Sequence, residues 1–276
     1  MARGIVYMLI AAFAFAWMNL LAKYLDGFHP LQVVFFRAMG TFVFIFPYML
    51  AKKVPVLGKN VFWLSFRGIL SFSSLALFFI VIQRIPLGSA VALRYTAPIF
   101  SVIFAYLLLK EKVKIWQWAA FALSAIGAFV MKGVDFRIDT LSFVLIIASS
   151  ILVGGVFAIV RYLGSREHFL TIINYFMVFS IVGSLFFIQH WRMPIGQEWY
   201  WVCSIGVLGL IGQIFLTRSF QLAETNTVAP IKYMELVYAL IFGYFFLNET
   251  YGLWPIVGMS LVVFGLLLNV WVKRKG

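Results

Sequence analysis

The chain repeats itself after 138 residues, which is half of its 276-residue length. Shifted by that distance and laid on itself without gaps, Arg94-Tyr95 aligns with Lys232-Tyr233. Identical residues also align along the whole half, in the pairs Val6/Val144, Tyr24/Tyr162, Met39/Met177, Trp63/Trp201, Gly68/Gly206, Gln83/Gln221, Tyr106/Tyr244, Glu111/Glu249, Trp116/Trp254 and Gly127/Gly265. Shared hydrophobicity alone would scatter such matches over many shifts. One register therefore predicts two repeats, at residues 1–138 and 139–276.

The composition is that of an integral membrane protein. Hydrophobic residues make up 64% of the chain and charged residues 11%, with a mean hydropathy of +1.01, whereas soluble domains contain about 25% charged residues. The single cysteine, Cys203, excludes an intramolecular disulfide. A net charge of +13 would suggest nucleic-acid binding in a soluble protein. Here it indicates cytoplasmic loops facing anionic lipid, so we expect a bilayer and no nucleic acid as partner.

Ten apolar stretches reach the roughly 20 residues that a helix needs to cross a bilayer. We predict spans at 4–22, 31–50, 61–81, 87–109, 113–131, 140–160, 169–189, 199–221, 225–247 and 251–272. The joins between them are short and rich in glycine and proline, and none could hold a soluble domain. The predicted fold is therefore all-α and integral to the membrane, with ten transmembrane helices.

The distribution of Lys and Arg predicts the orientation. With the N-terminus inside, twelve of these residues fall on the cytoplasmic side and five on the outer side, where the loop 132–139 would lie. We expect both termini to be cytoplasmic and the protein to lie in the cell membrane, in bacteria the inner membrane. Five spans per half is an odd number, so the two repeats should be inverted. Inverted repeats are typical of carriers that open alternately to two sides.

Six ionisable residues fall within predicted spans: Arg37, Arg67, Arg94, Arg218, Lys232 and Glu235. Each costs at least about 2.5–3.5 kcal/mol at mid-bilayer unless it is paired or hydrated. Arg67 and Arg218 lie close to the cytoplasmic ends of their spans, where their side chains can reach the interface. We expect these two to be structural or to face lipid.

Arg37 and Arg94 are predicted at the same depth, about 10 Å from the outer side at 1.5 Å per residue. Their guanidinium groups could therefore converge on one anion, although each could instead be a structural arginine bound to helix carbonyls. Pro98 cannot donate a hydrogen bond to the Arg94 carbonyl, which predicts a bend at this point.

Lys232 and Glu235 lie about one helical turn apart and share a helix face. They could form a pair that only neutralises itself, or they could gate the pathway, with Glu235 carrying a coupling proton. Asn19 and Tyr175 are weaker candidates for solute binding, and Asn19 could simply bridge helices. Small-residue ridges, such as Ser124 with Gly127, indicate close helix packing.

Sequence patterns of catalysis are missing. The three histidines, His29, His168 and His190, lie far apart in loops. The chain has no HExxH, GxSxG or Walker motif, and no two carboxylates share a span. We therefore expect neither an enzyme nor a bound cofactor or metal.

Two stretches resemble the EamA family of the drug/metabolite transporter (DMT) superfamily. The first is Tyr95-Thr96-Ala97-Pro98 with the apolar run that ends at Leu109-Lys110-Glu111-Lys112, and the second runs from Tyr233 to Glu249. The resemblance implies two inverted five-helix repeats and solute movement without ATP. It also implies that helices 1–4 and 6–9 line a central cavity, and that Glu111 and Glu249 are scaffold residues at the ends of spans.

The residues on these cavity-lining helices that we consider candidates for solute binding are Arg37, Arg94, Tyr95, Lys232, Tyr233 and Glu235.

The charges in this cavity predict its solute. Arg37, Arg94 and Lys232 carry three positive charges and Glu235 one negative charge, so the net charge of the cavity is +2. This charge favours a small organic anion or a zwitterionic metabolite. The alternative is an amino-acid or aromatic-metabolite exporter that recognises its solute through tyrosines and Trp17. A channel would need a continuous polar stripe, which the spans lack. Still open are the solute, the direction, proton coupling, and whether the protein is a monomer or a homodimer.

Overall fold

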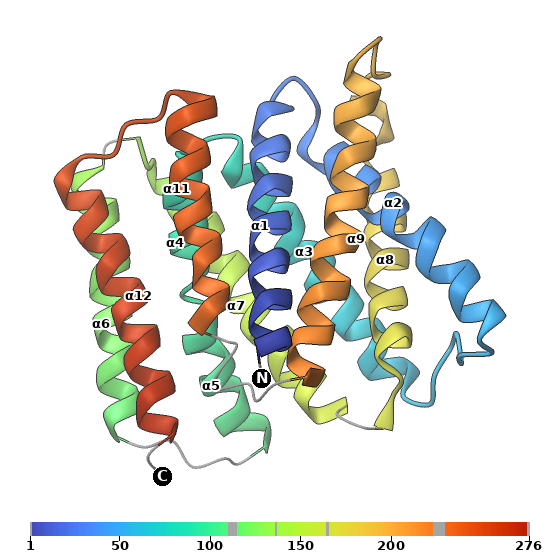
Figure 1. Cartoon of the computed structure of the whole chain (residues 1–276), viewed down its shortest axis with the longest axis horizontal. Coiled ribbons are helices and arrows are strands. Elements are labelled where there is room, and N and C mark those ends of the chain that lie inside the picture. The colour runs from blue at the N-terminus through green and yellow to red at the C-terminus, as the bar shows by residue number, and fades with distance from the viewer. Residues whose placement is uncertain (1, 110–114, 136, 164–165, 223–229, 275–276) are drawn as a thin grey trace.

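The computed structural model describes residues 2–109, 115–135, 137–163, 166–222 and 230–274 (Figure 1). The α-helices are α1 (Ala2–Tyr24), α2 (Pro30–Ala51), α3 (Val61–Ile82), α4 (Leu87–Arg94), α5 (Ala97–Leu109), α6 (Ile115–Val134), α7 (Thr140–Leu163), α8 (Phe169–Leu185), α9 (Glu198–Leu222), α11 (Met234–Leu247) and α12 (Leu253–Arg274). Two short 3-10 helices are η2 (Ile188–His190) and η3 (Pro230–Tyr233). Among the described residues, six helices are long and apolar enough to cross a membrane. The predicted all-α membrane fold is confirmed.

The fourth predicted span is two helices rather than one. α4 ends at Arg94 and α5 begins at Ala97, because Pro98 cannot donate to the Arg94 carbonyl. The Ser150 hydroxyl of α7 lies 3.4 Å from that carbonyl oxygen and 3.0 Å from the Ile146 carbonyl oxygen of its own helix. The predicted bend is therefore present, and a side chain from the second repeat lies within hydrogen-bond distance of the acceptor that the proline leaves free.

The second repeat breaks its helix at the equivalent place. Of the predicted span 225–247, the described part begins with η3, and α11 starts only at Met234. Arg94 ends α4 and its repeat counterpart Lys232 lies in η3. Each repeat thus places a cation and a following tyrosine where regular α-helix is interrupted. Side chains at such breaks in a membrane protein commonly contribute to a solute site.

Helix packing follows the repeat. α1 packs on α9 as α7 packs on α3, and α1 packs on α11 as α7 packs on α5. α2 and α8, which are repeat counterparts, contact each other, as do α6 and α12 at one edge of the molecule (Figure 1). This exchange of equivalent contacts describes two five-helix repeats related by a pseudo-two-fold axis.

The two repeats are inverted. Both termini lie at the same end of the molecule (Figure 1), which we call the terminal side. α1 starts there and ends at Tyr24 on the opposite side. α7 starts on the opposite side, where Arg137 just before it donates to the Thr250 carbonyl, and runs toward the terminal side. Its far end adjoins Glu167, which accepts hydrogen bonds from the Lys59 and Asn60 amides of the α2–α3 loop.

The α6–α12 contact shows how small residues fix this arrangement. A Cβ at Gly127 would lie 2.6 Å from the Gly258 carbonyl oxygen, so only glycine permits this approach. Ser124 Oγ donates to the Val262 carbonyl at 3.2 Å, and these residues are 138 positions apart. The pseudo-axis therefore passes between these helices.

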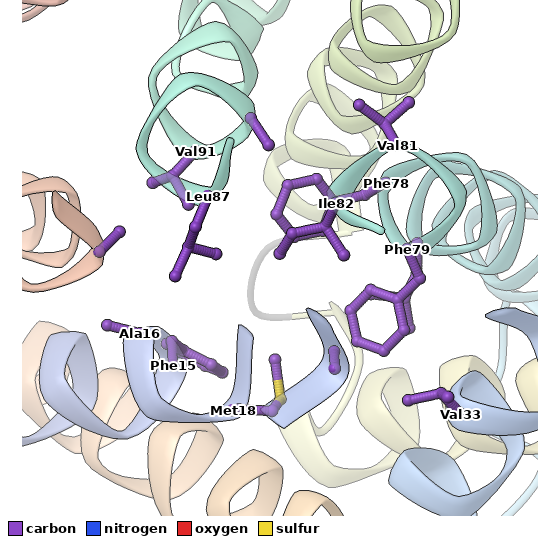
Figure 2. Close-up of a cluster of buried hydrophobic side chains, with 14 of the residues drawn as sticks. Phe15, Ala16, Met18, Val33, Phe78, Phe79, Val81, Ile82, Leu87 and Val91 are labelled. Atoms are coloured by element: carbon purple, nitrogen blue, oxygen red, sulfur yellow. The ribbon is translucent and has the colours of Figure 1, made fainter. Parts of the chain in front are cut away.

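A buried apolar core packs three helices of the first repeat together. Figure 2 shows Phe15 and Met18 of α1 facing Leu87 and Val91 of α4, with Phe78, Phe79 and Ile82 of α3 alongside. Phe79, Ile82 and Leu87 are completely buried. This core packs the upper halves of α1, α3 and α4 together and forms one wall of the cavity described next.

Candidate solute-binding cavity

A cavity of about 380 Å³ lies between the two repeats. Its polar lining consists of Asn19, Arg37, Arg67, Ser71, Ser74, Arg94, Tyr95, Gln213, Lys232, Tyr233 and Glu235. Among the described lining residues, none comes from α6 or α12. The helices on the cavity are therefore those that the family resemblance implies, and its volume suits a small solute.

Arg37 and Arg67 meet at one aromatic ring. The central guanidinium carbon of each lies 5.3 Å from the centroid of the Phe176 ring on α8. Both side chains are buried, with exposed fractions of 6% and 9%. Arg37 Nε donates to Met18 Sδ at 3.2 Å, and Arg67 Nη1 donates to the Ile172 carbonyl at 2.8 Å.

We expected Arg67 to be structural or to face lipid, and of these two alternatives the lipid-facing one is wrong. α8 packs over this end of α3, and the Ile172 carbonyl of α8 holds the guanidinium inside the protein. A side chain covered in this way has no free path to the interface. Arg218, by contrast, is exposed, as the sequence predicts.

Arg94 lies against α3. Its guanidinium carbon is 3.9 Å from the Phe78 ring centroid, a distance typical of a cation–π contact. Within the described residues, Arg94 and Lys232 donate no hydrogen bond. Arg37 and Arg94 both line the cavity. The two predicted arginines thus share one cavity, and Arg37 Nη1 is buried there without a hydrogen-bond partner among the described residues.

Glu235 is held by two neutral groups from other helices. Asn19 Nδ2 donates to Glu235 Oε1 at 3.0 Å, and the Tyr95 hydroxyl donates to Oε2 at 3.0 Å. The same hydroxyl lies 3.0 Å from the Lys232 carbonyl oxygen. Among the ion pairs of the described residues, none joins Lys232 to Glu235. The sequence places Lys232 and Glu235 on one helix face, but in the structure Glu235 accepts hydrogen bonds from Asn19 and Tyr95 instead of pairing with Lys232.

Tyr95 and Tyr233 mark the centre of the site. Their rings meet edge to face at a centroid distance of 5.2 Å, and the two residues are repeat counterparts. The pseudo-axis therefore passes between them. The charges around it are not symmetric, since the counterpart of Glu235 is Ala97 and that of Arg37 is Tyr175.

Two sequence candidates lie elsewhere. Tyr175 is not among the lining residues, and its hydroxyl donates to the Leu57 carbonyl at 2.8 Å on the terminal side. Trp17 packs in an aromatic cluster with Phe13, Phe242 and Phe246. Sequence reasoning missed Arg67 and Phe176. Treating every intramembrane arginine as a functional candidate would have included Arg67.

A hydrogen-bonded ion pair joins the two repeats on the side opposite the termini. Lys23 Nζ lies 3.0 Å from Glu249 Oε1, and Glu249 also accepts from the Leu87 amide at 2.8 Å. Tyr251 donates to Glu249 Oε2 at 2.5 Å and accepts from the Gly88 amide at 3.0 Å. We call Lys23, Glu249 and Tyr251 the latch.

The latch joins α1, α4 and the turn between α11 and α12. Glu249 thus does lie at a span end and links helices there, whereas its repeat counterpart Glu111 is outside the described residues. Among the described residues, no group of three or more His, Cys, Asp or Glu could hold a metal ion. The geometry is that of a charged cavity between the repeats, with the latch on the side opposite the termini.

Similar proteins are transporters. "Solute carrier family 35 member G1" of Mus musculus is 27% identical, covering 94% of this chain and 76% of that protein. "Pseudopaline exporter CntI" of Pseudomonas aeruginosa is 29% identical over 94% of this chain and 93% of its own length. "S-adenosylmethionine uptake transporter" of Rickettsia prowazekii is 25% identical, covering 99% of this chain and 94% of that protein. None of these descriptions names an enzyme.

The fold is also found among solved structures. One of them has a TM-score of 0.67 at 17% identity and covers 98% of both chains. The sequence profile of the EamA-like transporter family matches residues 2–132 and again 140–271. Two matches to one family, one in each repeat, account for nearly the whole chain. The chain is therefore a multi-pass membrane transporter that belongs to the EamA-like transporter family.

Proposed function

We propose that this transporter is a secondary carrier that moves a small organic anion or a zwitterionic metabolite by alternating access. One observation carries the proposal: the cavity contains three arginines and a lysine, and the only carboxylate among its described lining residues is bonded to Asn19 and Tyr95. Charges removed from water need a partner of opposite sign. An anionic solute would supply that partner.

The arrangement of the repeats supports alternating access. The latch joins the two repeats on one side, while Arg67 near the start of α3 and Leu216 near the end of α9 extend the cavity lining toward the terminal side. Inverted repeats that meet at Tyr95 and Tyr233 can exchange their conformations, which would open the opposite side. With both termini in the cytoplasm, the present conformation would face inward.

The aromatic-metabolite alternative has less support. It relies on tyrosines and Trp17, but Trp17 packs against other aromatic side chains outside the cavity lining. Tyr95 and Tyr233 remain, and Tyr95 is already bonded to Glu235. The named relatives include an exporter and an uptake transporter of similar identity, so their names favour neither direction.

Binding and exchange by the purified protein test the proposal. A panel of carboxylates and phosphate monoesters is screened by thermal shift, because a ligand at 100 times its Kd stabilises by about 2.7 kcal/mol. The best ligand is then followed in proteoliposomes. A carrier saturates and shows counterflow, whereas a channel does neither. Stabilisation by organic cations alone, with no acid binding, would overturn the proposal.

A further inference from the structure

Arg67 changes the charge of the cavity. Four cationic side chains line it, Arg37, Arg67, Arg94 and Lys232, and one carboxylate, Glu235. Four minus one leaves +3 when all are ionised, rather than the +2 predicted from the sequence. A solute with one acid group would leave +2 without compensation inside the membrane, where charge is costly.

The cations also have unused hydrogen-bond donors. A guanidinium carries five N–H groups. Within the described residues, Arg37 donates only to the Met18 sulfur, a weak acceptor, and Arg67 only to the Ile172 carbonyl. Arg37 Nη1 and Arg67 Nε are buried and have no hydrogen-bond partner there. Buried donors without an acceptor are unfavourable.

The cationic side chains of the cavity form two groups, and the arginines of each group contact a different aromatic ring. Arg37 and Arg67 contact the ring of Phe176 on α8, and Arg94 lies over the ring of Phe78 on α3, with Lys232 in η3. A cation–π contact uses the face of the guanidinium and leaves the donors at its edge free for an oxyanion. Each group could therefore bind an acid group of its own.

From these observations, and resting on the proposed carrier function, we propose that the solute carries at least two acid groups, carboxylate or phosphate. One is bound by Arg37 and Arg67 beside Phe176, and the other by Arg94 and Lys232. Arg67 is thus a specificity-determining residue, because it distinguishes a diacid from a monoacid. The cavity volume of about 380 Å³ keeps such a solute small.

A matched series of acids tests this inference. Binding of butyrate, succinate and tricarballylate to the purified wild-type protein is compared by calorimetry, with 3-phosphopropionate as the phosphate-bearing diacid. We expect the diacids to bind at least about tenfold more tightly than butyrate. Preference for succinate or for 3-phosphopropionate identifies the acid group, and either result supports the proposal.

The variant Arg67→Gln removes one cation of the Arg37 and Arg67 group. Diacid affinity should fall toward that of butyrate, so that the preference for diacids over butyrate is lost. Arg218→Gln removes an exposed arginine and is the matched control. The wild-type series remains decisive if Arg67→Gln does not fold. Equal wild-type affinity for butyrate and the diacids would overturn the two-acid inference but leave the anion carrier standing, whereas no binding of any acid would count against the proposed function itself.

Discussion

Lys23 Nζ at the end of α1 lies 3.0 Å from Glu249 Oε1 in the turn before α12, and the two side chains are only 16% and 9% exposed. The pair therefore joins the first and second repeats on the side opposite the termini. Tyr251 and the Leu87 amide complete the hydrogen bonds to the carboxylate. For the cavity to open on this side, the latch has to separate.

We predict that Glu249→Gln shifts the protein toward the conformation open on that side. The amide removes the ion pair with Lys23 but keeps the size of the side chain, and breaking a buried pair typically costs about 3–5 kcal/mol. In a Cys203→Ser background, a cysteine replaces Val91, which lines the cavity and is buried. A membrane-impermeant thiol reagent applied to intact cells should label this position several-fold faster in Glu249→Gln.

Arg192 and Glu198 provide a matched control on the same side. This pair is also close, at 2.7 Å, but its side chains are 42% and 32% exposed. Exposed pairs contribute about 0–1 kcal/mol, so Glu198→Gln should leave the labelling at position 91 unchanged. Equal labelling in Glu249→Gln and the parent would show that the latch does not hold this side closed.

Arg94→Ala should abolish transport and weaken anion binding while the protein still folds and inserts. The Arg94 guanidinium lies over Phe78 in the cavity, and within the described residues it donates no hydrogen bond, so its loss removes solute contacts rather than helix contacts. Arg94→Lys should recover little, because a point charge cannot replace a bidentate fork. Calorimetric binding and melting temperature are measured together. Arg218→Ala should stay active, and wild-type affinity in Arg94→Ala would rule out Arg94 as the main anion contact.

The sequence predicts the fold well because the relevant forces are local. Apolar runs of membrane width and the breakers between them define the spans, and Pro98 predicts the break after Arg94 without any tertiary information. The repeat adds the inversion, since each half has an odd number of spans. These features depend on single helices or on the order of helices, and both can be read directly from the sequence.

The site depends on contacts between helices, and these are harder to predict. Arg67 points into the protein because α8 packs over it. No pattern in the sequence of α3 predicts this contact with α8. Glu235 is bonded by Asn19 of α1 and Tyr95 of the other repeat, although Lys232 is its nearest charged neighbour in sequence. Tyr175 shares a repeat position with Arg37, yet its hydroxyl bonds to a loop carbonyl. Repeat equivalence predicts backbone positions, whereas side-chain partners follow from packing.

Glu235→Gln should fold stably, bind the solute and exchange it, but lose proton-driven accumulation. The partners of Glu235 are the neutral Asn19 amide and Tyr95 hydroxyl, and a glutamine can still accept a hydrogen bond from Asn19. If Glu235 carries the coupling proton, removing its ionisation uncouples transport from pH without emptying the site. Counterflow, pH-driven uptake and melting temperature are measured on the same protein.

The double variant Lys232→Met, Glu235→Gln distinguishes the structural alternative. If the two residues only neutralise each other, each single variant should lower the melting temperature, because it leaves one buried charge without a partner. The double variant should restore the melting temperature, because it leaves neither charge. We expect no such recovery, since no ion pair among those of the described residues joins the two. Uptake that remains pH-dependent in Glu235→Gln would exclude this carboxylate as the proton site.

The orientation of the protein can be tested at two exposed loop positions. Leu57, in the loop between α2 and α3 on the terminal side, is 71% exposed, and Met193, in the loop before α9 on the opposite side, is 78% exposed. Each is replaced by cysteine in a Cys203→Ser background. Because Lys and Arg are concentrated on the terminal side, we expect that side to be cytoplasmic.

An impermeant thiol reagent applied to intact cells should therefore label position 193 and spare position 57 until the membrane is permeabilised. The two positions have similar exposure, so a difference in labelling reports the side of the membrane rather than burial of the side chain. Labelling of position 57 but not of 193 in intact cells would place the termini outside. The conformation described here, closed by the latch, would then be the one that faces away from the cytoplasm.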